Sequence, residues 1–231
     1  MPHRVPPPHG PALTTLNVPD DARQRLLAAG LRLFAEQGYS KTSTRELADA
    51  ARVNVASISY YFGDKAGLYR ATFIEPMGTP DDDMARFNGL ELSLAQALRG
   101  FYDSFIEPLK QGDVARHCMK LQFREMVEPT GLFDPSEACG IRPIHEALVQ
   151  VLCRHLGLRR PDDDLARLAV CLAGLGVHMH VGRDITDQLA PRLNQGPRAL
   201  KLWADRLVMF GLAMVQAEAQ RRANLVLGDS A

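Results

Sequence analysis

Residues 54–69 read NVASISYYFGDKAGLY and concentrate polar side chains that could bind a phosphate-containing partner. The segment holds three tyrosines, two serines and one lysine. Hydroxyl and ammonium groups of this kind hydrogen-bond to phosphate oxygens and to the edges of bases. Tyrosines also commonly cover the edge of a core and leave their hydroxyl groups in water. The segment alone is compatible with either role.

A metal or catalytic site is the other chemistry to consider. His178 and His180 are two residues apart, and on a helix this spacing points them to nearly opposite sides, so they cannot hold one ion together. Glu125 and His178 could form a nucleophilic site with Cys153 or Cys171, but no GxSxG, HExxH, P-loop or dinucleotide motif accompanies them. We expect no catalytic residue, no metal and no cofactor. A helical enzyme that uses Glu125 and His178 is a distant alternative.

The composition fits a chain that folds around a core. Hydrophobic side chains make up 46% of the 231 residues, enough for one large domain or two small ones. The longest apolar run, residues 168–177, is far shorter than the roughly 20 residues that span a bilayer, and no apolar signal segment begins the sequence, so we expect a cytoplasmic protein without a membrane partner. The formal net charge of zero gives no support to nucleic-acid binding by itself. The cysteines have irregular spacings that favour reduced core thiols: Cys118, Cys139, Cys153 and Cys171.

Helical periodicity begins at Asp20, after a proline-rich arm over residues 1–18 that we expect to be disordered. Apolar residues in DDARQRLLAAGLRLFAEQG share one face, and Gly38 ends the segment. Ser43 and Glu46 then have the S-x-x-E spacing of a capping box. This spacing predicts a second, short helix of about two turns.

A third short helix is expected from Asn54, a good N-cap, to Phe62, before a Gly-Asp pair interrupts it. Two short helices joined by a turn of a few residues form the helix-turn-helix pattern. Within the third helix, Val53, Ile58 and Phe62 can pack against the first two helices. The side chains left for the outer side are Val55, Ser57, Ser59, Tyr60 and Tyr61.

The order of these elements resembles the TetR family of one-component transcriptional regulators. The resemblance covers residues 20–75, where GYSKTSTRELADAARVNVASISYYFGDKAGLY follows the family's pattern at nearly every position and a fourth helix is expected from Asp64 to about Glu75. It implies that the helix at 54–62 lies in the major groove of DNA. Arg52 departs from the pattern, since many members have glycine there. A left-handed backbone would strain a non-glycine residue at this turn, and the arginine adds a cation near DNA.

The resemblance also implies individual DNA contacts. The residues that would face bases are Val55, Ala56, Ser57 and Ser59, next to Asn54 at the helix start. The residues that would touch the DNA backbone or its phosphates are Thr42, Ser43, Tyr60, Tyr61 and Lys65, with Arg52 as an added cation. Specificity would then depend on thymine methyl contacts, serine hydroxyls and DNA shape. If Lys65 holds a phosphate, Lys65→Ala lowers the salt slope of DNA binding by about one.

The remainder of the chain carries apolar residues at helical spacing, in segments that mostly begin with acidic residues or end at glycine or proline. No segment alternates with a period of two over enough residues to predict a strand. We predict an all-α fold. Its parts are an N-terminal three-helix helix-turn-helix DNA-binding domain at residues 19–76 and a larger helical regulatory and dimerisation domain at residues 77–231.

The last two helices carry apolar residues most of the way around, more than one core needs. We predict that they pair with a second copy in a four-helix interface about a twofold axis, which the TetR resemblance favours; the alternative is a central helix in a monomeric bundle. The predicted interface residues are Leu168, Leu172, Leu175, Met179, Trp203, Leu207, Phe210 and Met214. Such a dimer would present two recognition helices about one DNA turn apart to an inverted repeat.

The middle segments FREMVEPTGLFDP and CGIRPIHEALVQVL resemble the regulatory domain of the TetR subgroup typified by CecR, formerly YbiH. This resemblance indicates a domain type and no particular ligand. An apolar cavity with a few polar groups could be lined by Phe101, Tyr102, Phe105, Met119, Phe123, Met126, Arg124, Glu125 and His178. The alternative is an ordinary core with a salt bridge at Arg124 or Glu125.

The sequence therefore predicts a homodimeric, DNA-binding transcriptional regulator, most simply a repressor that a small molecule releases from its operator. Its expected partners are double-stranded DNA with an inverted-repeat operator, a second copy of the chain and an unidentified small-molecule effector. A DNA-binding dimer that responds to a partner protein and has no small-molecule pocket is the alternative. Binding of small molecules would separate the two, because a ligand selective for the folded state stabilises it.

Overall fold

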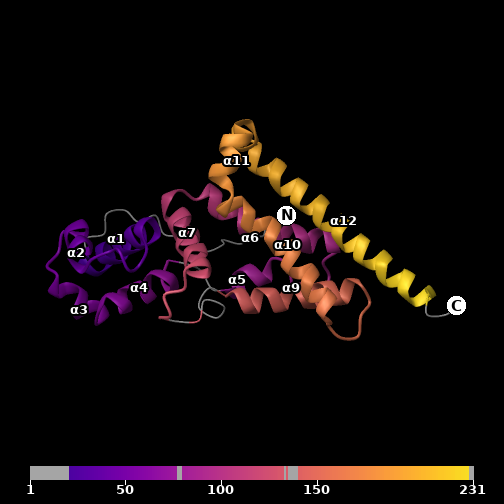
Figure 1. The fold of residues 1–231 in the computed structure, drawn as a ribbon, viewed down its shortest axis with the longest axis horizontal. Coiled ribbons are helices and arrows are strands. Elements are labelled where there is room, and N and C mark those ends of the chain that lie inside the picture. The colour runs from indigo at the N-terminus through magenta and orange to yellow at the C-terminus, as the bar shows by residue number, and fades with distance from the viewer. Residues whose placement is uncertain (1–20, 77–79, 133, 135–139, 229–231) are drawn as a thin grey trace, which may run out of the picture. The chain divides into compact units, whose positions relative to one another are not determined.

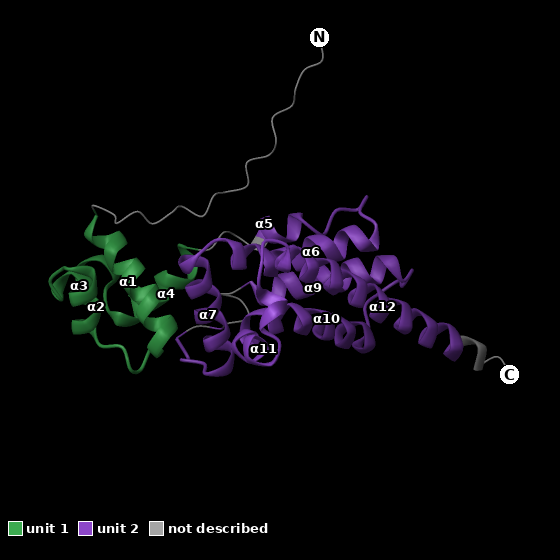
Figure 2. Ribbon diagram, turned by 90° about the horizontal axis from the view of Figure 1, so that it is seen from above, with its two compact units in different colours: residues 1–78 green, residues 79–231 purple. Residues whose placement is uncertain are grey.

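The computed structural model describes residues 21–76, 80–132, 134 and 140–228, and in these residues it contains helices and no strand. The all-α prediction is confirmed. The chain divides into two compact units, Met1–Gly78 and Thr79–Ala231, coloured green and purple in Figure 2. The arm predicted at residues 1–18 lies outside the described residues.

Within residues 21–76, the first unit consists of the helices α1 (Ala22–Gln37), α2 (Thr44–Ala51), α3 (Ala56–Phe62) and α4 (Lys65–Ile74), labelled in Figure 1. They correspond to the four helices expected from the sequence. Asp21 caps α1 by accepting a hydrogen bond from the backbone N–H of Arg23, and Asp64 caps α4 in the same way through Gly67. These caps fix the helix starts because they satisfy N–H groups that have no partner inside the helix.

The core of the first unit joins α1 to α4. The rings of Phe34 and Tyr69 meet edge to face with their centroids 4.9 Å apart. A Cβ atom added at Gly30 would lie 3.2 Å from Cγ2 of Thr72 and 3.3 Å from Cγ of Leu68, so glycine allows the close approach of the two helices. Fully buried aliphatic side chains complete this core: Leu26, Leu47, Ile58 and Leu68.

Arg23 connects three of the four helices of this unit. Its guanidinium donates two hydrogen bonds to the carboxylate of Glu75, at 2.8 and 2.5 Å. The guanidinium carbon also lies 5.1 Å from the ring centroid of Phe62. Bidentate bonds between arginine and a carboxylate are among the stronger polar contacts. The start of α1, the end of α3 and the end of α4 are thus held together at one side chain.

The described helices of the second unit are α5 (Pro80–Ala85), α6 (Leu94–Lys110), α7 (Asp113–Val127), α9 (Ile141–His155), α10 (Asp163–Val181), α11 (Arg183–Leu189) and α12 (Ala199–Gly228), with the 3-10 turn η1 (Pro191–Asn194) before α12. The long helices α6, α7, α9, α10 and α12 correspond to the segments expected from the sequence. The sequence does not predict α5, α11 and η1, because four to seven residues are too few for a periodic signal.

Helix α6 lies at the centre of the second unit and packs on α7, α9, α10 and α12. The hydroxyl group of Tyr102 is buried and donates a hydrogen bond to the backbone carbonyl of Leu172, at 3.2 Å. A Cβ atom at Gly176 would lie 2.7 Å from ring atoms of Phe105, so α10 approaches α6 closely through this glycine. These contacts fix the relative positions of α6 and α10.

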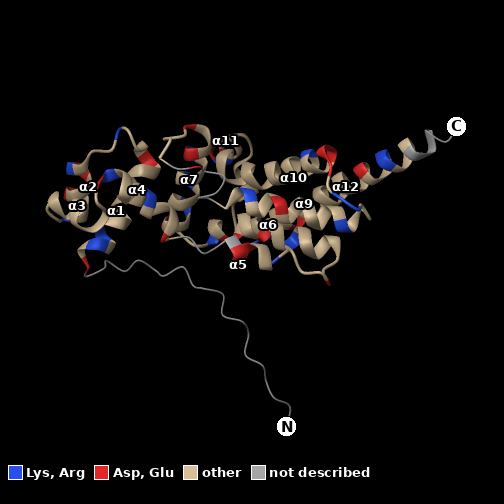
Figure 3. Ribbon diagram, turned by 90° about the horizontal axis from the view of Figure 1, so that it is seen from below, with Lys and Arg blue, Asp and Glu red and all other residues tan. Residues whose placement is uncertain are grey.

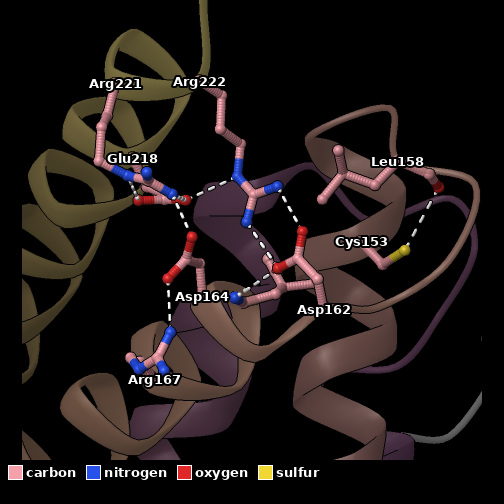
Figure 4. Close-up of polar contacts among 9 residues, drawn as sticks. Cys153, Leu158, Asp162, Asp164, Arg167, Glu218, Arg221 and Arg222 are labelled. Atoms are coloured by element: carbon pink, nitrogen blue, oxygen red, sulfur yellow. Dashed lines mark hydrogen bonds and ion pairs between the residues drawn. The ribbon is translucent and has the colours of Figure 1, made fainter. Parts of the chain in front are cut away.

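Ion pairs tie the C-terminal part of α12 to the start of α10 (Figure 4). Arg222 donates hydrogen bonds to both carboxylate oxygens of Asp162, at 2.7 and 2.8 Å, and Arg221 donates one to Asp164, at 2.7 Å. Both arginines also contact Glu218. The bonds from Arg222 hold the pKa of Asp162 well below its usual range. Asp162 in turn caps α10 by accepting a hydrogen bond from Leu165.

One described helix, α10, is long and apolar enough to cross a membrane by length and composition. Of the residues in its most apolar stretch, 33% are buried inside the second unit. A single helix of this kind is weak evidence for a membrane span, since helices in the cores of proteins meet the same criterion.

Candidate nucleic-acid interface

Two side-chain caps build the helix-turn-helix. Oγ of Ser43 accepts a hydrogen bond from the N–H of Glu46 at 3.1 Å, and the Glu46 carboxylate accepts one from the N–H of Ser43 at 2.8 Å. The predicted capping box is confirmed, and its hydrogen bonds lower the pKa of Glu46. Helix α3 begins at Ala56, two residues later than the expected cap at Asn54, and Val55 occupies the N-cap position without a side-chain cap. Oδ1 of Asn54 still accepts a hydrogen bond from the N–H of Ala56, at 2.9 Å.

Arg52 adopts the left-handed backbone conformation that the sequence raised as a possibility. Its φ is 54° and its ψ is 50°, and its N–H donates to the carbonyls of Ala48 and Asp49 at the end of α2. Glycine reaches this conformation without a steric cost, whereas other residues are strained in it. The arginine side chain is exposed in the turn before α3.

Helix α3 has one buried side and one exposed side. Ile58 is buried, whereas Ser57 and Tyr61 are half-buried. The exposed side chains are Asn54, Val55, Ala56, Ser59 and Tyr60. Apart from Tyr60 they are short. Short side chains on the outer face of a helix let its backbone approach the edges of bases in a major groove.

Tyr60 does not cover the edge of the core, which was the structural alternative for the tyrosines. Its side chain is 82% exposed, and its ring meets that of Tyr61 edge to face, with centroids 4.8 Å apart. Tyr61 is half-buried and lies 6.4 Å, between ring centroids, from Phe62. Tyr61 therefore packs partly against its own domain, while Tyr60 is held outward by its neighbour.

Thr42 and Lys65 do not have the exposed geometry expected of phosphate contacts. Thr42 is buried, and its hydroxyl donates a hydrogen bond to the carbonyl of Gly38 at 2.8 Å. Nζ of Lys65 donates to the carbonyls of Tyr39 and Thr42, at 3.0 and 2.9 Å, and lies 4.1 Å from the centroid of the Tyr39 ring. Desolvation lowers the pKa of Lys65. Both side chains hold the turn between α1 and α2 in place.

Two further cations lie exposed near the start of α2, and the sequence reasoning did not select them. They are Lys41, in the turn before α2, and Arg45, in its first turn; Figure 3 marks Lys and Arg in blue. The signal that could have indicated them is their position on either side of the Ser43 cap, because side chains at the start of a helix that faces DNA can reach its backbone.

The residues predicted to line a ligand cavity are spread between core and surface. Phe101, Tyr102 and Glu125 are buried, and Glu125 accepts hydrogen bonds from the N–H and the hydroxyl of Thr130, both at 2.8 Å. Arg124 pairs with Glu128 at 3.2 Å on the outer side of α7. Phe105, Met119 and Phe123 are half-buried, while Met126 and His178 are exposed. The ring of Phe101 contacts those of Tyr102 and Phe105, with centroids 5.3 and 5.4 Å apart, so these three lie together. A cavity lined by the whole set stays a prediction.

His180, not His178, faces the interior of the second unit. Nε2 of His180 lies 2.8 Å from the carbonyl oxygen of Phe105, and its ring centroid lies 5.4 Å from that of Phe123. Burial lowers the pKa of His180 because it disfavours the charged imidazolium. His178 is exposed, and its ring covers Gly182. The two histidines point in different directions, as their spacing indicated.

The residues predicted to form the dimer interface are also divided between the core and the surface. Leu168, Leu172, Met179 and Leu207 are buried in the core of their own chain, which leaves them little surface for contact with a second copy. Leu175, Trp203 and Met214 are half-buried and also pack on this core, whereas Phe210 is exposed. The outer face of α10 instead carries the exposed Val170, Cys171, Gly174 and Val181 beside the half-buried Val177. The outer face of α12 carries Leu202, Met209, Phe210 and Ala213.

The described residues include no group of three or more His, Cys, Asp or Glu side chains placed to hold a metal ion. Cys118 and Cys153 are buried free thiols, as expected, but Cys171 is exposed on α10. Cys139 lies outside the described residues. An open surface hollow of about 490 Å³ lies at the start of α10 and includes none of the predicted cavity residues; it is lined by Arg160, Pro161, Asp162, Asp163, Asp164 and Arg167. A much smaller hollow of about 10 Å³ is lined in part by His178, which the prediction included, together with Met179 and Trp203.

A helix-turn-helix whose second helix exposes mainly short side chains, followed in the same chain by a larger helical unit, defines a DNA-binding regulator. Two family models match the chain. One describes bacterial regulatory proteins of the tetR family and matches residues 26–72. The other describes the C-terminal domain of the HTH-type transcriptional dual regulator CecR and matches residues 94–216, more than half of the chain. The chain belongs to the TetR family of transcriptional regulators, with a C-terminal domain of the CecR type.

Similar proteins agree with this assignment. The HTH-type transcriptional dual regulator CecR of Shigella flexneri is 27% identical over 187 residues, 76% of this chain and 82% of that protein. Among solved structures, the fatty acid degradation regulator FadR from Bacillus halodurans has a TM-score of 0.58 at 16% identity and covers 84% of this chain and 96% of its own. NalD of Pseudomonas aeruginosa, a secondary repressor of a multidrug efflux pump, has a TM-score of 0.53 at 17% identity, with the same coverage of 84% and 96%. At these identities the two structures support the fold alone.

Proposed function

We propose that this regulator binds an inverted-repeat operator as a twofold dimer and represses transcription until a small molecule releases it. The observation that carries the proposal is the exposed side of α3, which presents Val55, Ala56 and Ser59 between fixed helix caps. A rigid helix with short outer side chains fits a major groove closely. As a regulator of transcription, it is expected to act in the cytoplasm.

The contacts with DNA fall into two sets. Val55 and Ala56 contact thymine methyl groups, and the hydroxyl of Ser59 reaches base edges; Ser57 contributes less, because it is half-buried. The phosphate contacts are Ser43, Arg52, Tyr60 and the added Lys41 and Arg45, all exposed. Thr42 and Lys65 act indirectly by holding the turn before α2.

The dimer forms through the outer faces of α10 and α12. On α10, residues 167, 170, 171, 174, 178 and 181 are exposed at a spacing of three or four, and most of them are apolar or small. On α12, Phe210 is 46% exposed and Leu202 is 60% exposed. Large apolar side chains clustered on neighbouring exposed faces commonly mark an interface. The twofold axis then sets the spacing of the two α3 helices to about one DNA turn or a multiple.

Release by an effector acts through α4. Arg23 bonds to Glu75 at the end of α4 and contacts Phe62 at the end of α3, so a shift of α4 is transmitted to the recognition helix. An effector that prefers the shifted position lowers DNA affinity, and DNA lowers effector affinity by the same factor, typically about 1–3 kcal/mol of coupling. Binding of both together without mutual effect would refute this mechanism.

Fluorescence anisotropy tests DNA recognition. Purified protein is titrated with labelled duplex from upstream of its own gene and with a scrambled duplex, at two salt concentrations. We expect an affinity for the specific duplex on the order of 10³ or more above that for the scrambled one. Equal and salt-sensitive affinities would move the search for an operator to other promoters. No binding to either duplex at low salt would overturn the role of α3.

Thermal-shift screening with small molecules tests effector control. A ligand that binds the folded state alone raises the melting temperature with its concentration. Hits are then added to the protein–DNA complex, where we expect release. A regulator controlled by a partner protein would give no hit that releases DNA.

A further inference from the structure

The segment between α10 and α12 has a fixed shape within the protomer. Nε1 of Trp203 donates a hydrogen bond to Oδ1 of Asn194, at 2.9 Å, and Nδ2 of Asn194 donates one to Asp187, at 2.7 Å. The hydroxyl of Thr186 donates to the carbonyl of Gly182, at 2.9 Å. We call residues 183–194, which comprise α11 and η1, the hook; Figure 1 shows α11 between the ends of α10 and α12. Side-chain hydrogen bonds thus join α11, η1 and α12.

The hook presents large apolar side chains to solvent. Ile185, Leu189 and Leu193 are 60%, 82% and 50% exposed, and no residue of α11 or η1 is buried. A single exposed leucine is ordinary, but three large apolar side chains within nine residues of an ordered segment form a patch. Charged residues border this patch: Arg183, Asp184, Asp187 and Arg192. An apolar centre with a polar rim is the usual composition of a protein interface.

The apolar patch continues the outer face of α10. Val170, Gly174, Val177 and Val181 recur at a spacing of three or four, and Ile185 and Leu189 extend the series. Backbone hydrogen bonds continue across the junction, from the N–H of Gly182 to the carbonyl of His178 and from the N–H of Thr186 to that of Gly182, both at 2.9 Å. Gly182, with a ψ of 2°, lies at the bend between α10 and α11, so the apolar series changes direction at this residue.

We propose that the hook packs on a second copy of this chain and widens the dimer interface beyond α10 and α12. The proposal rests on the dimer proposed above, because the hook lies at the end of the same apolar series. A rigid segment at the edge of a twofold interface reaches the partner copy without paying the entropy of ordering a loop. The partner copy covers Ile185, Leu189 and Leu193, and each copy supplies one hook to the other.

Sedimentation equilibrium of matched variants tests this packing. Ile185→Lys and Leu189→Lys are each expected to raise the dimer dissociation constant by on the order of tenfold or more, since a charge replaces a buried apolar contact. Leu90→Lys is the control, because Leu90 is 78% exposed in the second unit but belongs neither to the hook nor to the outer faces of α10 and α12. It should leave the dissociation constant unchanged. Circular dichroism should be unchanged for all three.

Cross-linking distinguishes direct contact from an indirect effect. A photoreactive amino acid at position 189 is incorporated into unlabelled protein, which is mixed and re-equilibrated with isotope-labelled wild-type protein. We expect cross-links from the unlabelled hook to labelled peptides of the other copy. Cross-links within one chain only, together with unchanged dissociation constants for the hook variants, would overturn the proposal.

The outcome for the hook can be separated from the outcome for the dimer. Phe210→Lys alters the outer face of α12, outside the hook, and should dissociate the dimer. If Phe210→Lys dissociates it and neither hook variant does, the hook proposal is wrong and the dimer stands. If the wild-type chain sediments as a monomer at micromolar concentration, both proposals fail.

Discussion

The ammonium group of Lys65 donates a hydrogen bond to the backbone carbonyl of Thr42, at 2.9 Å, and so ties the start of α4 to the turn before α2. A second hydrogen bond, to the carbonyl of Tyr39 at 3.0 Å, leaves this lysine one N–H. The family resemblance implied a phosphate contact at this position. The observed bonds give Lys65 a different primary task, which is to set the position of α2 against α4.

Lys65→Met should therefore lower stability more than it lowers the salt dependence of DNA binding. We expect a loss of about 1–3 kcal/mol, because two buried or half-buried carbonyls lose a charged donor. The salt slope should change by less than about one unit. Lys41→Met is the matched control, since Lys41 is exposed in the same turn, and it should lower the slope and leave stability unchanged. Urea unfolding and salt-dependent anisotropy measure the two effects. A unit loss of slope for Lys65→Met at unchanged stability would restore the phosphate contact.

Arg52→Gly should stabilise the first unit. The left-handed backbone of Arg52 costs about 1–2 kcal/mol for a residue with a Cβ atom, and the greater freedom of glycine in the unfolded chain offsets part of the gain. We expect a net gain of about 0.5–1 kcal/mol in the free energy of unfolding. Arg52→Ala removes the same charge but keeps the strained backbone, so it should not stabilise. A gain of equal size in both variants would assign the effect to charge.

The sequence predicts those parts of the structure that depend on local contacts. Ser43 and Glu46 are three residues apart, and their spacing alone predicts the capping box. The sequence does not predict which of the two apolar faces of α10 is buried. Leu172 and Val170 are equally apolar, and periodicity does not indicate which of them packs inside its own chain. The packing of α6, α9 and α12 against α10 buries Leu172 and leaves Val170 exposed. The hydrogen bonds of Lys65 could not be predicted for a related reason, since its partners are carbonyls that precede it by 23 and 26 residues.

His180 should make the protein less stable as the pH falls below 7. Burial lowers its folded-state pKa below the ordinary value of 6.5, so the unfolded chain binds the proton more readily. Stability is fully present above the unfolded pKa and falls as the pH drops toward the folded pKa, by about 1.4 kcal/mol per unit of pKa difference. His180→Gln can keep a donor for the Phe105 carbonyl and should flatten this dependence between pH 7 and 5. The exposed His178 provides the control variant His178→Gln, which should retain the wild-type slope.

The ion pair between Arg222 and Asp162 should hold the last turns of α12 in place. Arg222→Ala should speed amide hydrogen exchange over residues 217–225 by about fivefold, corresponding to about 1 kcal/mol or less for a largely exposed network. Arg159→Ala removes an exposed arginine from the nearby loop and is the control. Because the folded-state pKa of Asp162 is lowered, its contribution to stability is fully present above the unfolded-state pKa of 3.8. This contribution is lost only as the pH falls from there toward the folded-state pKa. The difference between the variants should thus persist at pH 5, and uniform exchange across them would exclude this role.

Cys171 provides a native probe of the proposed dimer face. Its thiol is exposed on the outer side of α10 beside Val170 and Gly174, whereas Cys118 and Cys153 are buried and burial raises the pKa of Cys118 to about 12. A maleimide should therefore react with Cys171 and spare the buried thiols, and peptide mapping identifies each modified cysteine. If α10 lies in the interface, Cys171 should react about tenfold or more slowly in the wild-type dimer than in the Phe210→Lys monomer. Equal rates in a dimer and a monomer would mean that the outer face of α10 stays open and that the two copies meet elsewhere.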